Sequence, residues 1–105
     1  MKRPAYDEVQ ARRLTPLLEA IGREIVEREK AMESLVQLNA WGMGKPGVLA
    51  RELALHRIEL LRAHLELEAL GCSLASRHPL TFRIRRVNDG GARCFIWQGQ
   101  DLLRH

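Results

Sequence analysis

The longest amphipathic pattern in the chain runs over residues 48–70, a leucine-rich stretch without glycine or proline that ends directly before Gly71. Six positions recur at alternating steps of three and four residues and form what we call the seam: Leu53, His56, Leu60, Ala63, Leu67 and Leu70. That spacing is typical of one helix face, and glycine is common just past a helix end. The pattern therefore predicts one helix over residues 48–70, about 35 Å long at ~1.5 Å per residue.

Further apolar side chains make this helix surface wider than one neighbouring helix covers. They are Leu49, Ile58, Leu61 and Leu65. Because one partner helix covers one stripe, the width predicts a second cover, which is a β-hairpin, another subunit, or both. We therefore expect a coiled-coil-like homo-oligomer, a dimer or a larger assembly, with a different protein partner as an open alternative.

The first part of the chain also has helical spacing. Asp7 and Gln10 form a capping-box pattern at its start. Pro16 disfavours helix in the residue before it, so we expect a kink or break there, with Thr15 capping the second part. Residues 39–47 contain three glycines and one proline, which predicts a loop between two antiparallel helices.

The region after Gly71 changes to a β pattern. Residues 81–87 and 92–97 flank the sequence Asn-Asp-Gly-Gly, which is a strong hairpin signal. With Asp89-Gly90 as the turn, Ile84 pairs with Phe95, and Phe82 pairs with Trp97. The prediction is a single domain, 1–105, of the α+β class and mostly α: a kinked first helix (8–38), a loop (39–47), a second helix (48–70) and a β-hairpin (81–97).

Charge separates the hairpin from the rest of the chain. The formal net charge is +4, and residues 72–105 supply all of it, with six arginines against two aspartates. The candidate nucleic-acid-binding residues are Arg83, Arg85, Arg86 and Arg93. Arginines on a β-ribbon are suited to phosphate contacts, but they also protect an exposed strand from stacking. Both interpretations stay open.

Arg28 occupies a position where the helix seam calls for an apolar residue. One interpretation is a guanidinium that holds a small anionic ligand between the helices, in an enzyme or a carrier. The other is an ion pair with Glu24 or Glu59. In the predicted antiparallel hairpin, residues whose numbers sum to about 86 lie level, so Arg28 is expected beside Ile58 and Glu59.

The sequence favours a non-enzymatic oligomerisation or interaction module. No nucleophile with an adjacent base and no zinc-type spacing marks a site, so no catalytic residue, metal or cofactor is predicted. Cys72 and Cys94 are the only cysteines, and residues 1–9 lack the apolar run of a secretory signal. We therefore expect reduced thiols in the cytoplasm. The longest stretch free of charge, residues 34–44, has 11 residues, too few to span a membrane.

The order of short motifs also resembles a known arrangement. The residues concerned are Tyr6-Asp7-Glu8-Val9, Leu14-Thr15-Pro16-Leu17-Leu18, Leu67-Glu68-Ala69-Leu70-Gly71 and Cys94-Phe95-Ile96-Trp97-Gln98-Gly99. In this respect the chain resembles a small bacterial family known only as a domain of unknown function. The resemblance implies a long helical hairpin followed by a β segment, and it carries over no activity.

Overall fold

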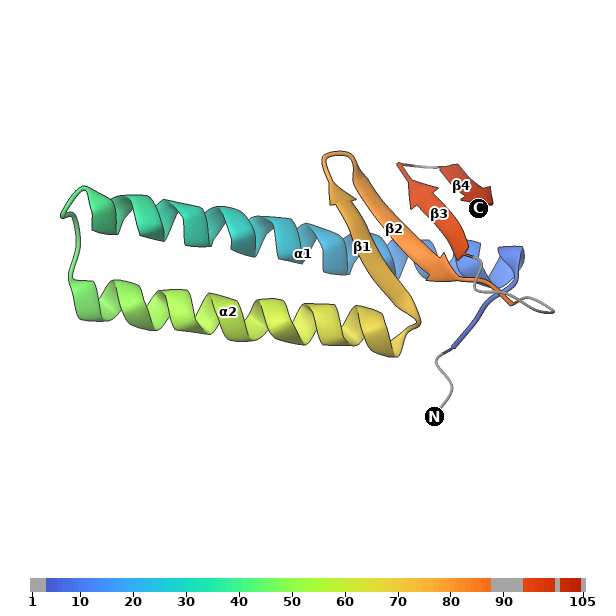
Figure 1. The fold of residues 1–105 in the computed structure, drawn as a ribbon, viewed down its shortest axis with the longest axis horizontal. Helices are drawn as coiled ribbons and strands as arrows, with labels where there is room; N and C mark the ends of the chain where they lie inside the picture. Colours follow the sequence, from blue (N-terminus) through green and yellow to red (C-terminus); the bar gives the residue numbers. More distant parts are fainter. Residues whose placement is uncertain (1–3, 88–93, 100, 105) are drawn as a thin grey trace.

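The computed structural model describes residues 4–87, 94–99 and 101–104. Its elements are α1 (Glu8–Ala40), α2 (Pro46–Ala69), β1 (Cys72–Arg77), β2 (Leu80–Arg85), β3 (Cys94–Gln98) and β4 (Asp101–Arg104). The two helices lie antiparallel, and the strands cross one face of the hairpin near the start of α1 (Figure 1). The predicted α+β class with a mostly helical chain is confirmed.

Helix α1 begins at the predicted capping box. The carboxylate of Asp7 accepts a hydrogen bond from the Gln10 backbone N–H at 2.8 Å, and the Asp7 N–H donates to Gln10 Oε1 at 3.0 Å. A second helix start at Thr15 is not present, because α1 is helical on both sides of Pro16. Proline has no N–H for the carbonyl four residues earlier, and the Thr15 hydroxyl donates to that carbonyl, of Arg12, at 2.8 Å.

The helical hairpin has the predicted pairing. On α2, Ala63 and Leu67 of the predicted seam are buried, and the other seam positions are partly buried. Arg28 Nη1 lies 3.3 Å from His56 Nδ1, and Arg28 Nη2 lies 4.0 Å from Glu59 Oε2. The antiparallel arrangement predicted from the loop is therefore present, and Arg28 lies beside Glu59 as the predicted pairing requires.

The strands form one antiparallel sheet in the order β1-β2-β3-β4. The predicted register between β2 and β3 is confirmed, with Phe82 opposite Trp97 and Ile84 opposite Phe95. The outer strands β1 and β4 were not predicted from the sequence. The expected Asp89-Gly90 turn lies outside the described residues.

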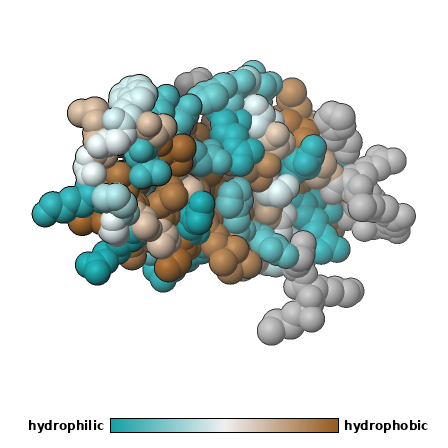
Figure 2. Space-filling model, turned by 60° about the vertical axis from the view of Figure 1, so that its left-hand side comes forward, coloured by the Kyte–Doolittle hydropathy of each residue, from teal (hydrophilic) through white to brown (hydrophobic). Residues whose placement is uncertain are grey.

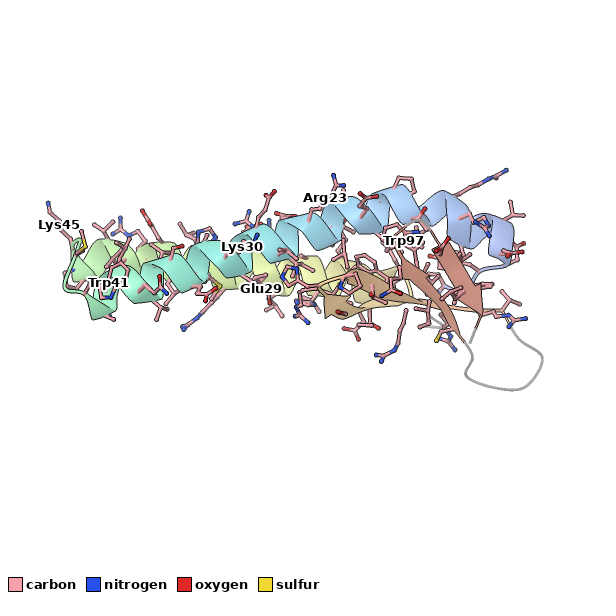
Figure 3. The ribbon with its side chains drawn as sticks, turned by 90° about the horizontal axis from the view of Figure 1, so that it is seen from above. Arg23, Glu29, Lys30, Trp41, Lys45 and Trp97 are labelled. Carbon is pink, nitrogen blue, oxygen red and sulfur yellow. The ribbon has the colours of Figure 1, made fainter. Side chains whose placement is uncertain are left out.

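The core lies where the sheet covers the helices. Phe82, Ile84, Phe95 and Trp97 of the sheet are buried together with Ala11, Leu18, Ile21, Ile25, Ala63, Leu67 and Cys72. Gly22 permits this close approach, because a Cβ atom at its position would lie 2.5 Å from Phe82 Cζ. Figure 3 shows Trp97 on the strand side of α1, far from the hairpin tip that carries Trp41 and Lys45.

The segment before α1 is tied to the same end of the molecule. The Tyr6 N–H donates to Arg85 O, and the Val87 N–H donates to Tyr6 O, both at 3.0 Å. The Tyr6 hydroxyl donates to Leu70 O at 2.7 Å. Tyr6 therefore joins the end of α2 to the end of β2.

The other end of the hairpin has no core. No residue from Val26 to Arg62 is buried, and the molecule measures 56 × 30 × 20 Å. Its radius of gyration is 16.8 Å, against about 13 Å for a compact chain of this length. Its accessible surface is 7433 Å², whereas a compact monomer of this mass exposes about 6,000 Å². The helices thus extend well beyond the sheet that covers them.

Candidate functional site

The outward face of α2 carries an apolar stripe that two exposed arginines, Arg51 and Arg62, interrupt. Its members are Val48, Leu55, Ile58, Leu61 and Leu65, each between 51% and 61% exposed. At 100° per residue these side chains gather around the direction of Ile58, opposite the seam that packs on α1. Figure 2 shows hydrophobic side chains, in brown, among polar ones on the lower part of the molecule, where α2 lies. We call these five residues the α2 stripe.

The α2 stripe contrasts with the exposed side of α1. Over the bare part of the hairpin, the exposed positions of α1 are mostly charged or polar: Glu27, Lys30, Glu33, Ser34, Gln37 and Asn39, with Val36 as the large apolar one. A polar outer face is what a helix in contact with water requires. The α2 stripe therefore is not a general property of the exposed hairpin.

Arg28 is engaged within the chain. Its Nε donates to Glu24 Oε1 at 3.1 Å, and the guanidinium also reaches His56 and Glu59. The ion pairs with Glu24 and Glu59 that the sequence suggested as an alternative to ligand binding are therefore both present. The Arg28 guanidinium therefore links α1 to α2 and already has the anionic partners that a ligand would replace.

The four candidate arginines do not gather on one described surface. Arg83 and Arg85 are exposed and alternate with the buried Phe82 and Ile84, so they lie on the outer face of the sheet. The Arg86 guanidinium instead lies 5.5 Å from the ring centre of Phe95. Arg93 lies outside the described residues. Across the strands, Arg83 is opposite Ser73 and Ile96, which are uncharged.

Burial suppresses the ionisation of one thiol. Cys72 is buried beside the end of α2, where its Sγ donates to Leu70 O at 3.5 Å. Burial raises its pKa to about 12. Burial also raises the pKa of Tyr6, and the charge on Cys72 adds to this effect. A thiol that stays protonated at neutral pH is a poor nucleophile and metal ligand, so Cys72 has a packing role.

Comparisons with known proteins add no assignment, because no family model, curated protein or solved structure matches the chain. The resemblance to a bacterial family therefore stays a prediction. Within the described residues, neither helix is long and apolar enough to cross a membrane. The same part of the chain contains no group of three or more His, Cys, Asp or Glu side chains placed to hold a metal ion.

Sequence reasoning found part of the α2 stripe and missed the rest. Ile58, Leu61 and Leu65 belong to the wide surface predicted from the sequence, and Leu49 of that set is partly buried. Val48 and Leu55 were not included. The sequence signal that could have found them is their spacing: Val48 and Leu55 are seven residues apart, and Leu55 and Ile58 are three apart. Both spacings place side chains on the same helix face.

Proposed function

We propose that this protein is a non-enzymatic interaction module that forms a homodimer through the α2 stripe. The observation that carries the proposal is an apolar stripe directly opposite the α1 seam, with four of its five residues on the hairpin half without any buried residue. A contiguous exposed apolar surface on a folded protein is typical of a protein–protein contact. The resulting contact places α2 between α1 of its own chain and α2 of the second copy.

The centre of the α2 stripe is symmetrical about Ile58. Leu55 stands three residues before Ile58 and Leu61 three residues after it. In an antiparallel pair of α2 helices with a two-fold axis at Ile58, Leu55 lies level with the partner's Leu61. Every contact then occurs twice, which is the property of a two-fold dimer. A second copy of the chain is therefore a fitting occupant of this face.

Charge supports the same arrangement. Arg51 stands seven residues before Ile58 and Glu66 eight residues after it, and both are exposed. In the antiparallel pair, Arg51 lies level with the partner's Leu65. It is therefore one residue, about 1.5 Å along the axis, from the level of the partner's Glu66, on the same side of the contact. Two such exposed ion pairs add orientation rather than much affinity.

The surface area is sufficient for a dimer. The chain exposes about a quarter more surface than a compact monomer of its mass. A standard interface removes about 800 Å² from each partner, which is less than this excess. Dimerisation thus removes from water some of the apolar helix surface that the sheet does not cover.

The test is the molar mass in solution, measured by sedimentation equilibrium at tens of micromolar protein. We expect twice the chain mass of 12.0 kDa for the natural sequence. Ile58→Lys places two cations at the two-fold axis and is expected to give a monomer. His64→Lys introduces the same residue at an exposed position about a third of a turn from Ile58, and the dimer should persist.

A natural sequence that stays monomeric at this concentration contradicts the proposal, as does a dimer that tolerates Ile58→Lys. The register has its own check: Arg51→Glu should weaken the dimer, and adding Glu66→Arg should restore it. Recovery in the double variant requires that the two residues meet across the contact.

We also infer a cytoplasmic location. Both cysteines are free, and unpaired thiols persist in a reducing compartment.

A further inference from the structure

A groove lies at the boundary between the covered and bare halves, between α1 and two turns of the sheet. Its volume is about 420 Å³, and α1 supplies one wall through residues between Glu19 and Lys30. The β1–β2 turn at His78-Pro79 and Gly99 after β3 form the opposite side. The volume lies within the range of small-molecule sites, about 300–1,000 Å³.

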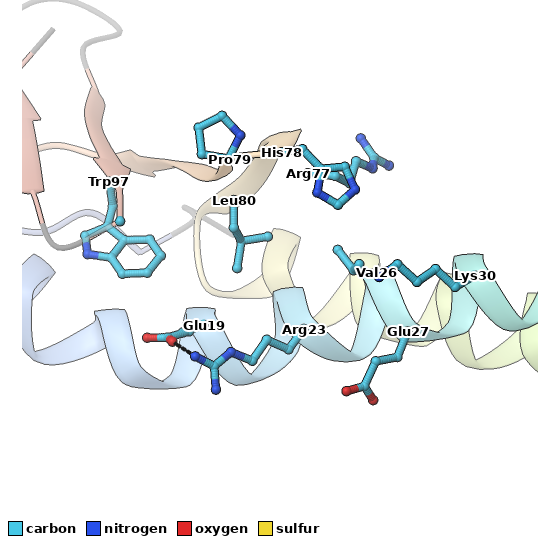
Figure 4. A pocket seen from close by; sticks show the side chains of 11 residues that line it. Glu19, Arg23, Val26, Glu27, Lys30, Arg77, His78, Pro79, Leu80 and Trp97 are labelled. Carbon is cyan, nitrogen blue, oxygen red and sulfur yellow. Dashed lines mark hydrogen bonds and ion pairs between the residues drawn. The ribbon is translucent and has the colours of Figure 1, made fainter.

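The inner wall of the groove is apolar and held in place by the core. It consists of Val26, Leu80 and Trp97. Trp97 is 7% exposed, and its ring centre lies 5.7 Å from that of Phe82. Gly22 allows Leu80 to lie close to α1. Leu80 and Trp97 come from the sheet and Val26 from α1, so the apolar wall spans both sides of the groove (Figure 4).

The rim carries charges of both signs, and two of its cations are already engaged. Arg23 is paired with Glu19, and Arg77 makes two hydrogen bonds to Glu29, at 3.2 and 3.3 Å. These pairs hold the rim in a defined geometry.

The remaining cation is Lys30. Among the described residues, the Lys30 ammonium makes no ion pair, and it lines the groove together with His78. Glu27 also lines the groove, but Figure 4 shows its carboxylate on the side of α1 away from Leu80 and Trp97. The side of the groove that faces the strands thus combines a free cation with an apolar wall.

We propose that this groove binds a small organic anion with an aromatic body. The ring lies against Trp97, Leu80 and Val26, and the acidic group is held by Lys30 with His78 beside it. A carboxylate and a phosphate monoester share this chemistry. The site is independent of the α2 stripe, because none of its lining residues belongs to α2.

The experiment uses Trp97 as the reporter. Trp41 is 68% exposed at the hairpin tip, so Trp41→Phe leaves Trp97 as the single tryptophan without disturbing the core. Phenylacetate, phenyl phosphate and neutral phenylacetamide are titrated, and tryptophan fluorescence is recorded. We expect saturation by at least one of the two anions with a Kd of about 0.1–1 mM, which is within the limit that ligand size sets. The tighter anion identifies the acidic group.

Two variants separate the site from non-specific binding. Lys30→Gln removes the charge and should weaken anion binding about tenfold, the lower end for a charge-assisted contact because the groove is open. Lys45→Gln makes the same change at the tip and should leave Kd unchanged. Circular dichroism checks that both variants are folded.

Three results would each overturn the proposal: no saturation by either anion up to about 10 mM, well above the expected Kd; equal affinity for phenylacetamide and the anions; or an unchanged Kd in folded Lys30→Gln. None of these results bears on the dimer, whose mass is measured separately.

Discussion

The two halves of the helical hairpin are built from the same two helices and differ in what covers them. Where the sheet crosses, Leu18, Ile25 and Leu67 are buried with five side chains from the strands. Beyond the sheet, no residue of either helix is buried until the chain returns to Ala63. A third layer thus decides whether a leucine on this hairpin stabilises the folded chain or remains in contact with water.

This difference separates folding from association. The covered half contains the aromatic core and closes the chain ends, so we infer that it supplies the stability of the monomer. The bare half carries four of the five residues of the α2 stripe, whose burial needs a second molecule. Substitutions in the two halves should therefore change different observables, and the following predictions are arranged by size.

The largest contrast is between two leucines of the same helix. Leu67 is 1% exposed and Leu55 is 56% exposed. Leu67→Ala should lower the free energy of unfolding by about 2–5 kcal/mol, because it removes buried surface and leaves a cavity. Leu55→Ala should change it by less than about 0.5 kcal/mol at concentrations where the chain is monomeric. Urea unfolding of dilute protein measures both.

The same pair also separates the two observables. Leu55→Ala should weaken dimerisation in sedimentation experiments, while Leu67→Ala should act on unfolding of the single chain. Equal losses of monomer stability would mean that the two halves are not distinct.

The next effect concerns how completely water is excluded from the covered half. The pKa of Cys72 is about 12 in the folded chain and near 9.0 when unfolded. Between these values the folded state keeps a proton that the unfolded state has lost, so stability falls as pH rises above about 9. The slope approaches 1.4 kcal/mol per pH unit.

Urea unfolding between pH 8 and 11 measures this slope. Cys72→Ala should flatten it in the lower part of the range, whereas Cys94→Ala, at a partly exposed position, should keep it. The raised pKa of Tyr6 acts in the same direction at higher pH. A flat profile in the natural sequence would show that water reaches Cys72.

The smallest contrast uses one glycine from each half. Gly22→Ala brings a Cβ against the fully buried Phe82, and the expected loss is about 1–2 kcal/mol after the gain in helix propensity is subtracted. Gly47→Ala, in the first turn of α2, meets no atom within 4 Å. It should stabilise the chain by about 0.5–1 kcal/mol. Thermal unfolding of both variants gives the two signs, and a shared sign would remove the contrast.

Much of the fold follows from spacing along the chain. The seam of α2, the capping box of α1 and the β2–β3 register depend on neighbours in sequence or on one reverse turn, and they are confirmed. The position of Arg28 opposite Glu59 in the antiparallel hairpin follows from the length of the loop. These features are local, so the sequence alone determines them.

The features that were missed have no clear signal in the spacing of residues along the chain. Strand β1 reads Cys-Ser-Leu-Ala-Ser-Arg and β4 has four residues, so neither shows a clear alternation of buried and exposed positions. Pro16 remains within α1 because the Thr15 hydroxyl replaces the missing donor. The groove beside Trp97 joins α1 to two turns, and no spacing rule places Lys30 near residues 77–80.

The bonds made by Tyr6 bear on the order in which the chain assembles. Its hydroxyl meets Leu70 across 64 positions, and its backbone meets β2 still later in the chain. Closing so long a loop early is entropically costly, whereas the helical hairpin and the strand pairs form from near neighbours. The first residues therefore dock last, after the helices have turned back and the sheet exists to receive them.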